Sequence, residues 1–357
     1  MYPILRRKKT MKVDRIQEQL KIVLRVFYDI QKERVSMANR IDSLIYLSEC
    51  ERDESGRPII KKRDKPATKE EEAAAEKEKE SQQKKLLNAI GEFYAEHNEA
   101  YYKNGTMKSR QKYLDKQGGI IRTVPVWVLY EKYHNLEEEE NNLLTVISNY
   151  VQKHYLWTDF LSGIYGCGVL MAAVILTEFN VHEAPHVSCF WAYAGLDVTK
   201  DPETGLMVGR SRKKSLMKTV RYLNADGEEE ERKSLGYNPM LKTKLIGVLA
   251  QKMIFFKKKA QEHLKEGQTD YYGEYVRYKE RKTKENELKG LGRTKAHINN
   301  MAIRYMVKLF LKDLYLFWRE REGYELEPDY AEAKIFGRPH IRGKIGDGVA
   351  YTNTVKN

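Results

Sequence analysis

The sequence predicts a mainly α-helical protein in which a long antiparallel coiled-coil arm leads into a compact helix-hairpin-helix domain with a small β-hairpin. The arm is predicted by two long segments in which apolar residues recur at heptad spacing. The compact domain is predicted by a turn rich in glycine that opens onto an apolar helical run over 169–179.

Each of the two heptad seams has one polar interruption. The first is interrupted at Arg34, and its apolar members are Ile16, Leu20, Val23, Phe27, Ile30, Met37, Ile41 and Leu44. The second is interrupted at Glu140, and its members are Leu129, Tyr133, Leu136, Leu143, Ile147, Tyr150, His154, Trp157 and Leu161. Because an apolar seam needs a partner, we expect the two helices to pair, or the chain to form a homo-oligomer through them.

Composition changes along the chain suggest its domain boundaries. We divide it into a basic N-terminal tail (1–14), the arm (15–160), the helix-hairpin-helix domain (161–320) and a C-terminal tail (321–357). A charged insert (52–119) separates the two seams and contains the run KEEEAAAEKEKESQQKK. Such a run has little apolar surface to bury, so we expect a solvated helix or a disordered bridge without chemistry.

Turn and strand signals mark the remaining elements. Gly118 and Gly119 predict the turn before the returning helix. Residues 218–223 are typical of a strand, and the turn chemistry of Asn224–Gly227 predicts a hairpin over 218–233. Further helices are expected at 240–259, 271–284 and 298–320.

Charge and cysteine content narrow the class of protein. The chain has 357 residues and carries 64 Lys and Arg against 51 Asp and Glu, a net charge of +13 that favours a nucleic-acid partner. Its three cysteines are far apart and form no CxxC motif, which favours a reducing, cytoplasmic location. No apolar stretch is long enough for a transmembrane helix, so we expect no membrane partner.

Two patterns suggest metal chemistry, and the residues argue against both. His182 to His186 spell HExxH, which binds zinc only when it is helical, and Pro185 opposes that helix. We therefore expect a loop between two helices there. The carboxylates lie mostly in charged runs and not on an apolar strand pattern, so we expect no metal site made by this chain alone.

The glycine turn is the first candidate for nucleic-acid binding. Gly163, Gly166 and Gly168 precede the apolar helix, and glycines let the amides at a helix N-terminus approach a phosphate closely. We take Gly166 and Gly168 as the binding residues. The alternative is a tight connection between packed helices that binds nothing.

The second candidate is a basic loop. Between Gly209 and Tyr222 the chain has no acid and six basic residues, which are Arg210, Arg212, Lys213, Lys214, Lys218 and Arg221. Charge of one sign on a loop and strand favours contact with a phosphate backbone. The alternative is an exposed basic patch without a partner.

Hydroxyl groups beside these cations are candidates for chemistry. Ser211 and Ser215 lie among guanidinium and ammonium groups that could stabilise an oxyanionic transition state at phosphorus. The alternative role for each hydroxyl is a hydrogen bond to a DNA phosphate.

Four segments in this order resemble the C-terminal transposase domain of the IS-one-ten family of insertion-sequence transposases. They are GIYGCGVLMAAVILTEF, FWAYAGLDV, SLGYNPMLKTKLIGVLA and NNMAIRYMVKLFLKDLYLFWR, and the heptad helices are similar to the coiled coil that precedes that domain. The resemblance covers about residues 15–320. It implies a DNA recombinase that works with a structured guide RNA and uses a serine nucleophile.

The chain departs from the family pattern at two places. We expect no RuvC-like acidic domain, because too few residues precede the first seam, so magnesium would have to enter through a partner domain. Where the family has its serine in an E-S-G context, this chain has Glu203, Thr204 and Gly205. The resemblance therefore adds Thr204 to Ser211 and Ser215 as a catalytic candidate. The expected function is a DNA-binding transposase, and the alternatives are a non-catalytic DNA-binding architectural protein and an RNA-binding scaffold.

Overall fold

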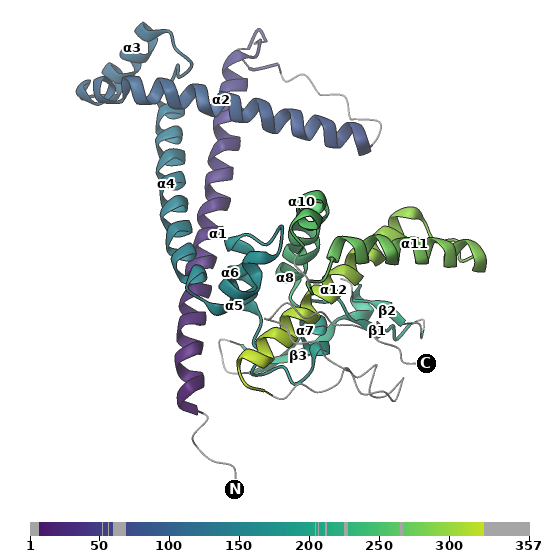
Figure 1. Ribbon diagram of the computed structural model, residues 1–357. Coiled ribbons are helices and arrows are strands. Elements are labelled where there is room, and N and C mark those ends of the chain that lie inside the picture. The colour runs from purple at the N-terminus through teal and green to yellow at the C-terminus, as the bar shows by residue number, and fades with distance from the viewer. Residues whose placement is uncertain are drawn as a thin grey trace, which may run out of the picture. The chain divides into compact units, whose positions relative to one another are not determined.

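The computed structural model describes residues 7–51, 53–55, 57–59, 69–203, 205, 207–210, 213–224, 228–264 and 267–324, and within them the fold is mainly α (Figure 1). The chain divides into two compact units, one formed by Ile22–Val146 and the other by Met1–Lys21 together with Ile147–Asn357. No helix of the described chain is long and apolar enough to cross a membrane.

The unit of residues 22–146 is a small helical bundle. It contains most of α1 (Arg7–Glu49) and α4 (Val124–Gln152), together with α2 (Lys69–Lys103) and α3 (Met107–Gln117). Its core is rich in aromatic side chains, and Tyr101 stacks on the fully buried Trp127 with ring centroids 4.0 Å apart. Gly118 ends α3 in the left-handed conformation (φ 63°), which confirms the turn predicted there.

The charged insert is only partly what we predicted. The Lys/Glu run forms the exposed first part of α2, as a solvated helix. The second part of α2 enters the core through Ile90, Tyr94 and Tyr101. The prediction concerned only the charged run and did not extend to the residues after it, where three large apolar side chains recur on one helical face.

The two seam helices pair through α1 and α4. Figure 1 shows them running in opposite directions, and Arg34 on α1 contacts Glu140 on α4. The register of the seams differs from the prediction in places: Leu24 and Val151 are buried, whereas Tyr150 is 40% exposed. The second seam also ends early, since α4 ends at Gln152 and His154 begins a new helix.

The other unit has α6 (Val169–Glu178) and α12 (Lys295–Arg321) at its centre. Seven consecutive residues of α6, 171–177, are buried, and α12 carries the largest buried set of the unit. Around these two helices lie α5 (Tyr155–Asp159), α7 (Val187–Tyr193), α8 (Pro239–Thr243), α9 (Ala250–Phe255), α10 (Lys257–Glu262) and α11 (Tyr271–Lys289). Short 3-10 turns occupy Leu161–Gly163 and Lys214–Leu216.

The helix predicted over 240–259 is interrupted twice. A π-helical segment, Lys244–Leu249, separates α8 from α9, and Phe256 separates α9 from α10. The other two helices are longer than predicted. α11 begins at Tyr271 as predicted but continues to Lys289, where Gly290 ends it in the left-handed conformation, and α12 begins at Lys295, because Thr294 caps its first turn.

Two antiparallel hairpins complete this unit. The predicted hairpin is confirmed as β3 (Lys218–Leu223) paired with β4 (Glu229–Ser234), with Arg221 opposite Glu231. A second hairpin, β1 (Val198–Lys200) with β2 (Met207–Gly209), was expected only as a loop. Strands of three residues are too short to show an alternating pattern.

Candidate nucleic-acid interface

The glycine turn lies between α5 and α6 and contacts α9. Gly166 has a φ of 97°, and a Cβ atom there would lie 2.9 Å from Cβ of Lys252 and from the backbone nitrogen of Met253. A side chain at this position would therefore be strained and would also collide with α9. Gly166 brings α9 close to the turn, which is the packing role of the alternative reading.

Gly168 has a different position. It caps the N-terminus of α6, is exposed, and has no atom within 4 Å of the place a Cβ would occupy. The cap supplies no side-chain acceptor for the first amides of α6, which leaves them for water or an anion. The φ of Gly168 is −80°, a value that any residue can adopt, so the backbone conformation does not require glycine at this position.

Lysines of α9 and α10 lie beside the turn. Lys252 is next to Gly166, and its charge acts on Cys167, whose thiol pKa is nevertheless raised to about 12 by burial. The ring of Tyr165 lies 5.7 Å from that of His263 at the end of α10. We call this the glycine-turn surface; it comprises Gly166, Gly168, Lys252, Phe255, Lys257, Lys258 and Lys259.

Phe255 is the unexpected member of this surface. It is the last residue of α9, where the helix breaks before α10, and its side chain is 79% exposed. An aromatic ring exposed among lysines is a combination typical of proteins that stack on nucleic-acid bases. The sequence signal, FF followed by KKK, lies within the helix predicted over 240–259 and was not singled out as a binding feature.

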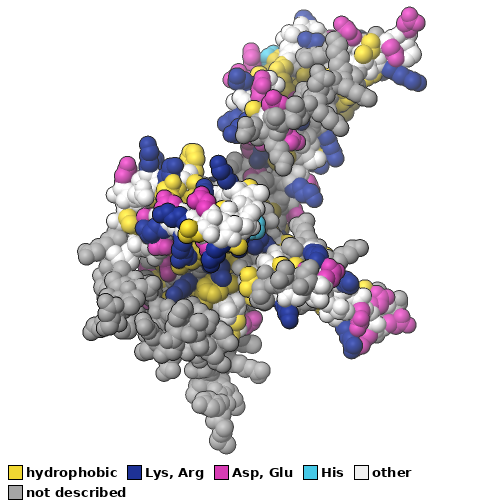
Figure 2. All heavy atoms as spheres, turned by 90° about the vertical axis from the view of Figure 1, so that its right-hand side faces the viewer, with side chains coloured by type: hydrophobic (Ala, Val, Ile, Leu, Met, Phe, Trp, Pro, Cys, Tyr) yellow, Lys and Arg dark blue, Asp and Glu magenta, His cyan; other side chains and the backbone are white. Residues whose placement is uncertain are grey.

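The basic loop meets acids from outside its own sequence. Nε of Arg210 lies 2.7 and 2.9 Å from the two carboxylate oxygens of Asp197, which precedes β1. Arg221 pairs with Glu231 at 3.0 Å across the β3–β4 hairpin. Figure 2, which views the molecule from the α11 side, also shows basic and acidic side chains intermixed. These cations are therefore less available to phosphate than the sequence indicates.

Lys213 is held in a similar way at the end of the β1–β2 hairpin. Its ammonium lies 2.9 Å from Oδ2 of Asp201 and 2.7 Å from Oε2 of Glu203. Asp201 is buried, and its hydrogen bonds from Lys213 and from the amide of Glu203 lower its pKa.

The remaining predicted site residues are only partly visible. Thr204, Ser211 and Arg212 lie outside the described residues, and Lys214 and Lys218 are described by backbone only, in a 3-10 turn and in β3. Oγ of Ser215 is buried and lies close enough to Asp201 to help lower the pKa of that carboxyl group.

The HExxH segment forms a loop between α6 and α7, as predicted. Nδ1 of His182 lies 2.8 Å from the hydroxyl of Tyr324, and His186 begins α7. The two histidines do not share a helical face. No group of three or more potential metal ligands is found in the described ranges.

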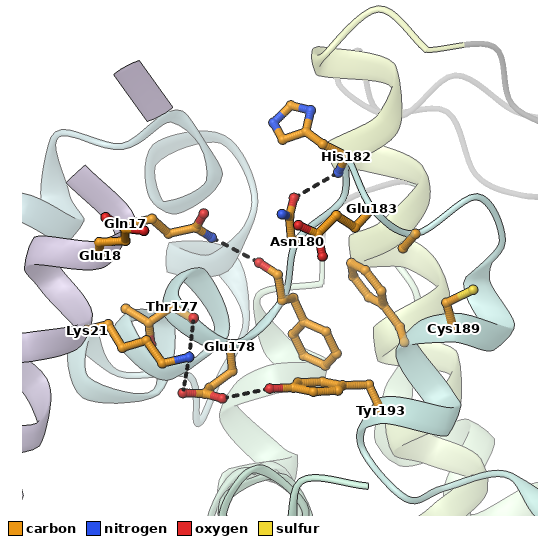
Figure 3. A pocket seen from close by; sticks show the side chains of 13 residues that line it. Gln17, Glu18, Lys21, Thr177, Glu178, Asn180, His182, Glu183, Cys189 and Tyr193 are labelled. Atoms are coloured by element: carbon orange, nitrogen blue, oxygen red, sulfur yellow. Dashed lines mark hydrogen bonds and ion pairs between the residues drawn. The ribbon is translucent and has the colours of Figure 1, made fainter. Parts of the chain in front are cut away.

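A cavity of about 800 Å³ lies where the start of α1 meets the end of α6 (Figure 3). Gln17 donates a hydrogen bond of 2.9 Å to the carbonyl of Phe179, and Lys21 pairs with Glu178 at 3.2 Å. Glu178 also accepts a hydrogen bond from Tyr193. These polar side chains satisfy the end of α6, so we interpret this region as the attachment of α1.

The structure also brings together cations that are far apart in the sequence. Lys242 on α8 and Arg304 on α12 both lie at the end of β2, beside Arg210. No spacing in the sequence could have indicated this cluster.

Comparison of the chain with protein-family models, with curated proteins and with solved structures gives no match.

Proposed function

We propose that this chain is a DNA-binding recombinase of the insertion-sequence type, related to the IS-one-ten family, that holds the DNA backbone on its glycine-turn surface. One observation carries the proposal. The N-terminus of α6 is open at Gly168, and two residues earlier Gly166 packs against Lys252 of α9. The highly exposed Phe255 ends α9, and three further lysines follow on α10. Helix amides and lysines bind phosphate, and an exposed ring binds a base.

In the described part of the chain, the lysines of the glycine-turn surface are free of ion-pairing acids, as binding of a phosphate backbone requires. Lys252, Lys257, Lys258 and Lys259 are exposed, and none has a carboxylate at ion-pair distance among the residues that the structure describes. Asp197, Glu203 and Glu231 instead pair with cations of the hairpin region. Positive charge thus remains available at the glycine turn.

Chemistry in this proposal belongs to a hydroxyl of the hairpin region, with Thr204, Ser211 and Ser215 as candidates. Attack on phosphorus would join the hydroxyl to one DNA end and release the other, without an added oxidant or cofactor. Among the described residues, no group of carboxylates lies close enough together to bind magnesium, so we assign no step to a metal ion bound by this chain alone. We propose further that the chain works in the cytoplasm, together with a partner domain that supplies magnesium and with a guide RNA.

The second candidate function is non-catalytic DNA or RNA binding, and the buried Oγ of Ser215 favours it. Trapping with a suicide DNA substrate, with magnesium and any flanking RNA present, separates the two. A covalent adduct on one of the three hydroxyls supports the recombinase. Tight binding without an adduct under any of these conditions supports the architectural role.

Salt-dependent binding of a labelled duplex tests the interface itself. Contact with about four phosphates gives a slope of log affinity against log salt near −4. Replacing Lys257, Lys258 and Lys259 with glutamine should make the slope shallower by roughly two to three. The matched control replaces Lys77, Lys79 and Lys84, which are exposed on α2. An equal change in both triple variants would show that the glycine-turn surface is not the interface.

A further inference from the structure

The end of β2 carries a cluster of cations drawn from three elements. Nζ of Lys242 donates a 2.7 Å hydrogen bond to the carbonyl of Arg210 and lies 4.7 Å from the ring centroid of Tyr237. The guanidinium of Arg304 lies directly against Gly209, where a Cβ atom would overlap its Nη1. Glycine at position 209 thus makes room for the guanidinium.

The charges of this cluster do not balance. Arg210 is neutralised by Asp197, which contacts its Nε through both oxygens. Neither Lys242 nor Arg304 has a carboxylate at ion-pair distance within the described ranges, and both are half-buried. Burial and the charge of Arg304 lower the pKa of Lys242 to about 8, although the carboxylate of Asp197, which neutralises Arg210, acts in the opposite direction. Two desolvated cations of the same sign repel each other, and an anion between them would relieve the repulsion.

We propose that Lys242 and Arg304, at the end of β2, form a binding site for a phosphate oxyanion. A guanidinium and an ammonium together are the groups that proteins use for phosphate. The π-helical segment that follows α8 supports a functional role, because such segments are frequent at functional sites. In the context of the proposed function, on which this identification of the ligand rests, the phosphate belongs to the DNA backbone, bound at a second point distinct from the glycine turn.

The site predicts a coupling between binding and protonation. An anion favours the charged form of Lys242, so its pKa should rise above about 8 on binding, with uptake of a proton. Affinity should therefore fall as the pH rises through about 8. A lysine that only packs against Tyr237 would show no response to phosphate.

The experiment follows the pKa of Lys242 in the full chain by NMR of ¹³C-labelled lysine. The pH titration is made on the protein without ligand, with inorganic phosphate and with a short DNA duplex. The expected result is a rise of about one unit with phosphate or duplex. The rise should be lost in Arg304→Gln, partly kept in Arg304→Lys, and unchanged in Arg281→Gln, an exposed cation on α11. Circular dichroism confirms that each variant is folded.

The outcomes distinguish this site from the proposed function. If duplex binding depends on the glycine-turn lysines while Lys242 responds to neither ligand, the phosphate site is wrong and the proposed function stands. If phosphate raises the pKa of Lys242 but the chain binds no duplex, the site stands as one for free phosphate groups and the proposed function fails. Loss of the response in Arg281→Gln as well would overturn the assignment to Arg304.

Discussion

Arg34 and Glu140, which interrupt the two heptad seams, form an ion pair with each other, with 2.5 Å between Nε and Oε2. The pair is mostly buried, since the side chains are 23% and 13% exposed. Gln31 donates a 2.9 Å hydrogen bond to the other oxygen of Glu140. Each interruption is therefore the partner of the other, and together they fix the register of α1 against α4.

A double-mutant cycle measures this pair. Arg34→Leu or Glu140→Leu alone should lower the free energy of unfolding by about 2 kcal/mol, because each leaves a partly buried charge without its partner. The double leucine variant should recover most of the loss. Urea unfolding provides the measurement, and additive losses would show that the two residues are not coupled.

Asp313 should make stability depend on pH. Its carboxylate is buried on α12 and accepts hydrogen bonds from Thr269 and Tyr271, and burial raises its pKa above the ordinary value of 3.8. The folded state therefore keeps a proton that the unfolded state has released. Stability should fall as pH rises from about 3.8 through the folded pKa. Comparing urea unfolding of wild type and Asp313→Asn across this window tests it, since the asparagine variant should lack that part of the fall.

Gly168→Asp should raise stability and weaken DNA binding together. An aspartate at the N-cap can accept the free amides of α6 and favours the helix dipole, which stabilises by about 0.5–1 kcal/mol. The same carboxylate would occupy and repel the phosphate site. Thermal unfolding and duplex affinity are both measured, and a more stable variant with unchanged affinity would remove the α6 N-terminus from the interface.

Gly166→Ala should lower stability, in contrast to Gly168→Asp. The positive φ and the contact with α9 make any side chain unfavourable, by about 1–2 kcal/mol. Its melting temperature should fall, whereas Gly168→Ala should change it little.

Phe255→Ala should weaken binding to single-stranded DNA by about 1–3 kcal/mol, the range for one stacked base. Phe255→Trp should retain binding, and its fluorescence should be quenched by the oligonucleotide. Leu288, which is 87% exposed on α11, supplies the matched control as Leu288→Ala. Equal affinity of wild type and Phe255→Ala would exclude stacking at this position.

The sequence was sufficient to predict those parts of the fold that are specified by a local pattern. Heptad spacing predicted the pairing of α1 with α4, and the turn chemistry of Asn224 to Gly227 predicted the β3–β4 hairpin. The sequence was insufficient to predict the parts of the candidate site in which side chains from distant segments contact each other. The acids that pair with Arg210 and Lys213 come from before and after β1, and Lys242 meets Arg304 from another helix. A loop that looks uniformly basic in sequence is thus largely neutralised by its neighbours.

The inert thiol of Cys167 makes the chain suited to site-specific labelling. Its burial and raised pKa protect it from alkylation, whereas Cys50 and Cys189 are half-buried. These two cysteines belong to different compact units, Cys50 to residues 22–146 and Cys189 to the other. Donor and acceptor dyes on Cys50 and Cys189 would therefore report, through energy transfer, any movement between the units when DNA is added.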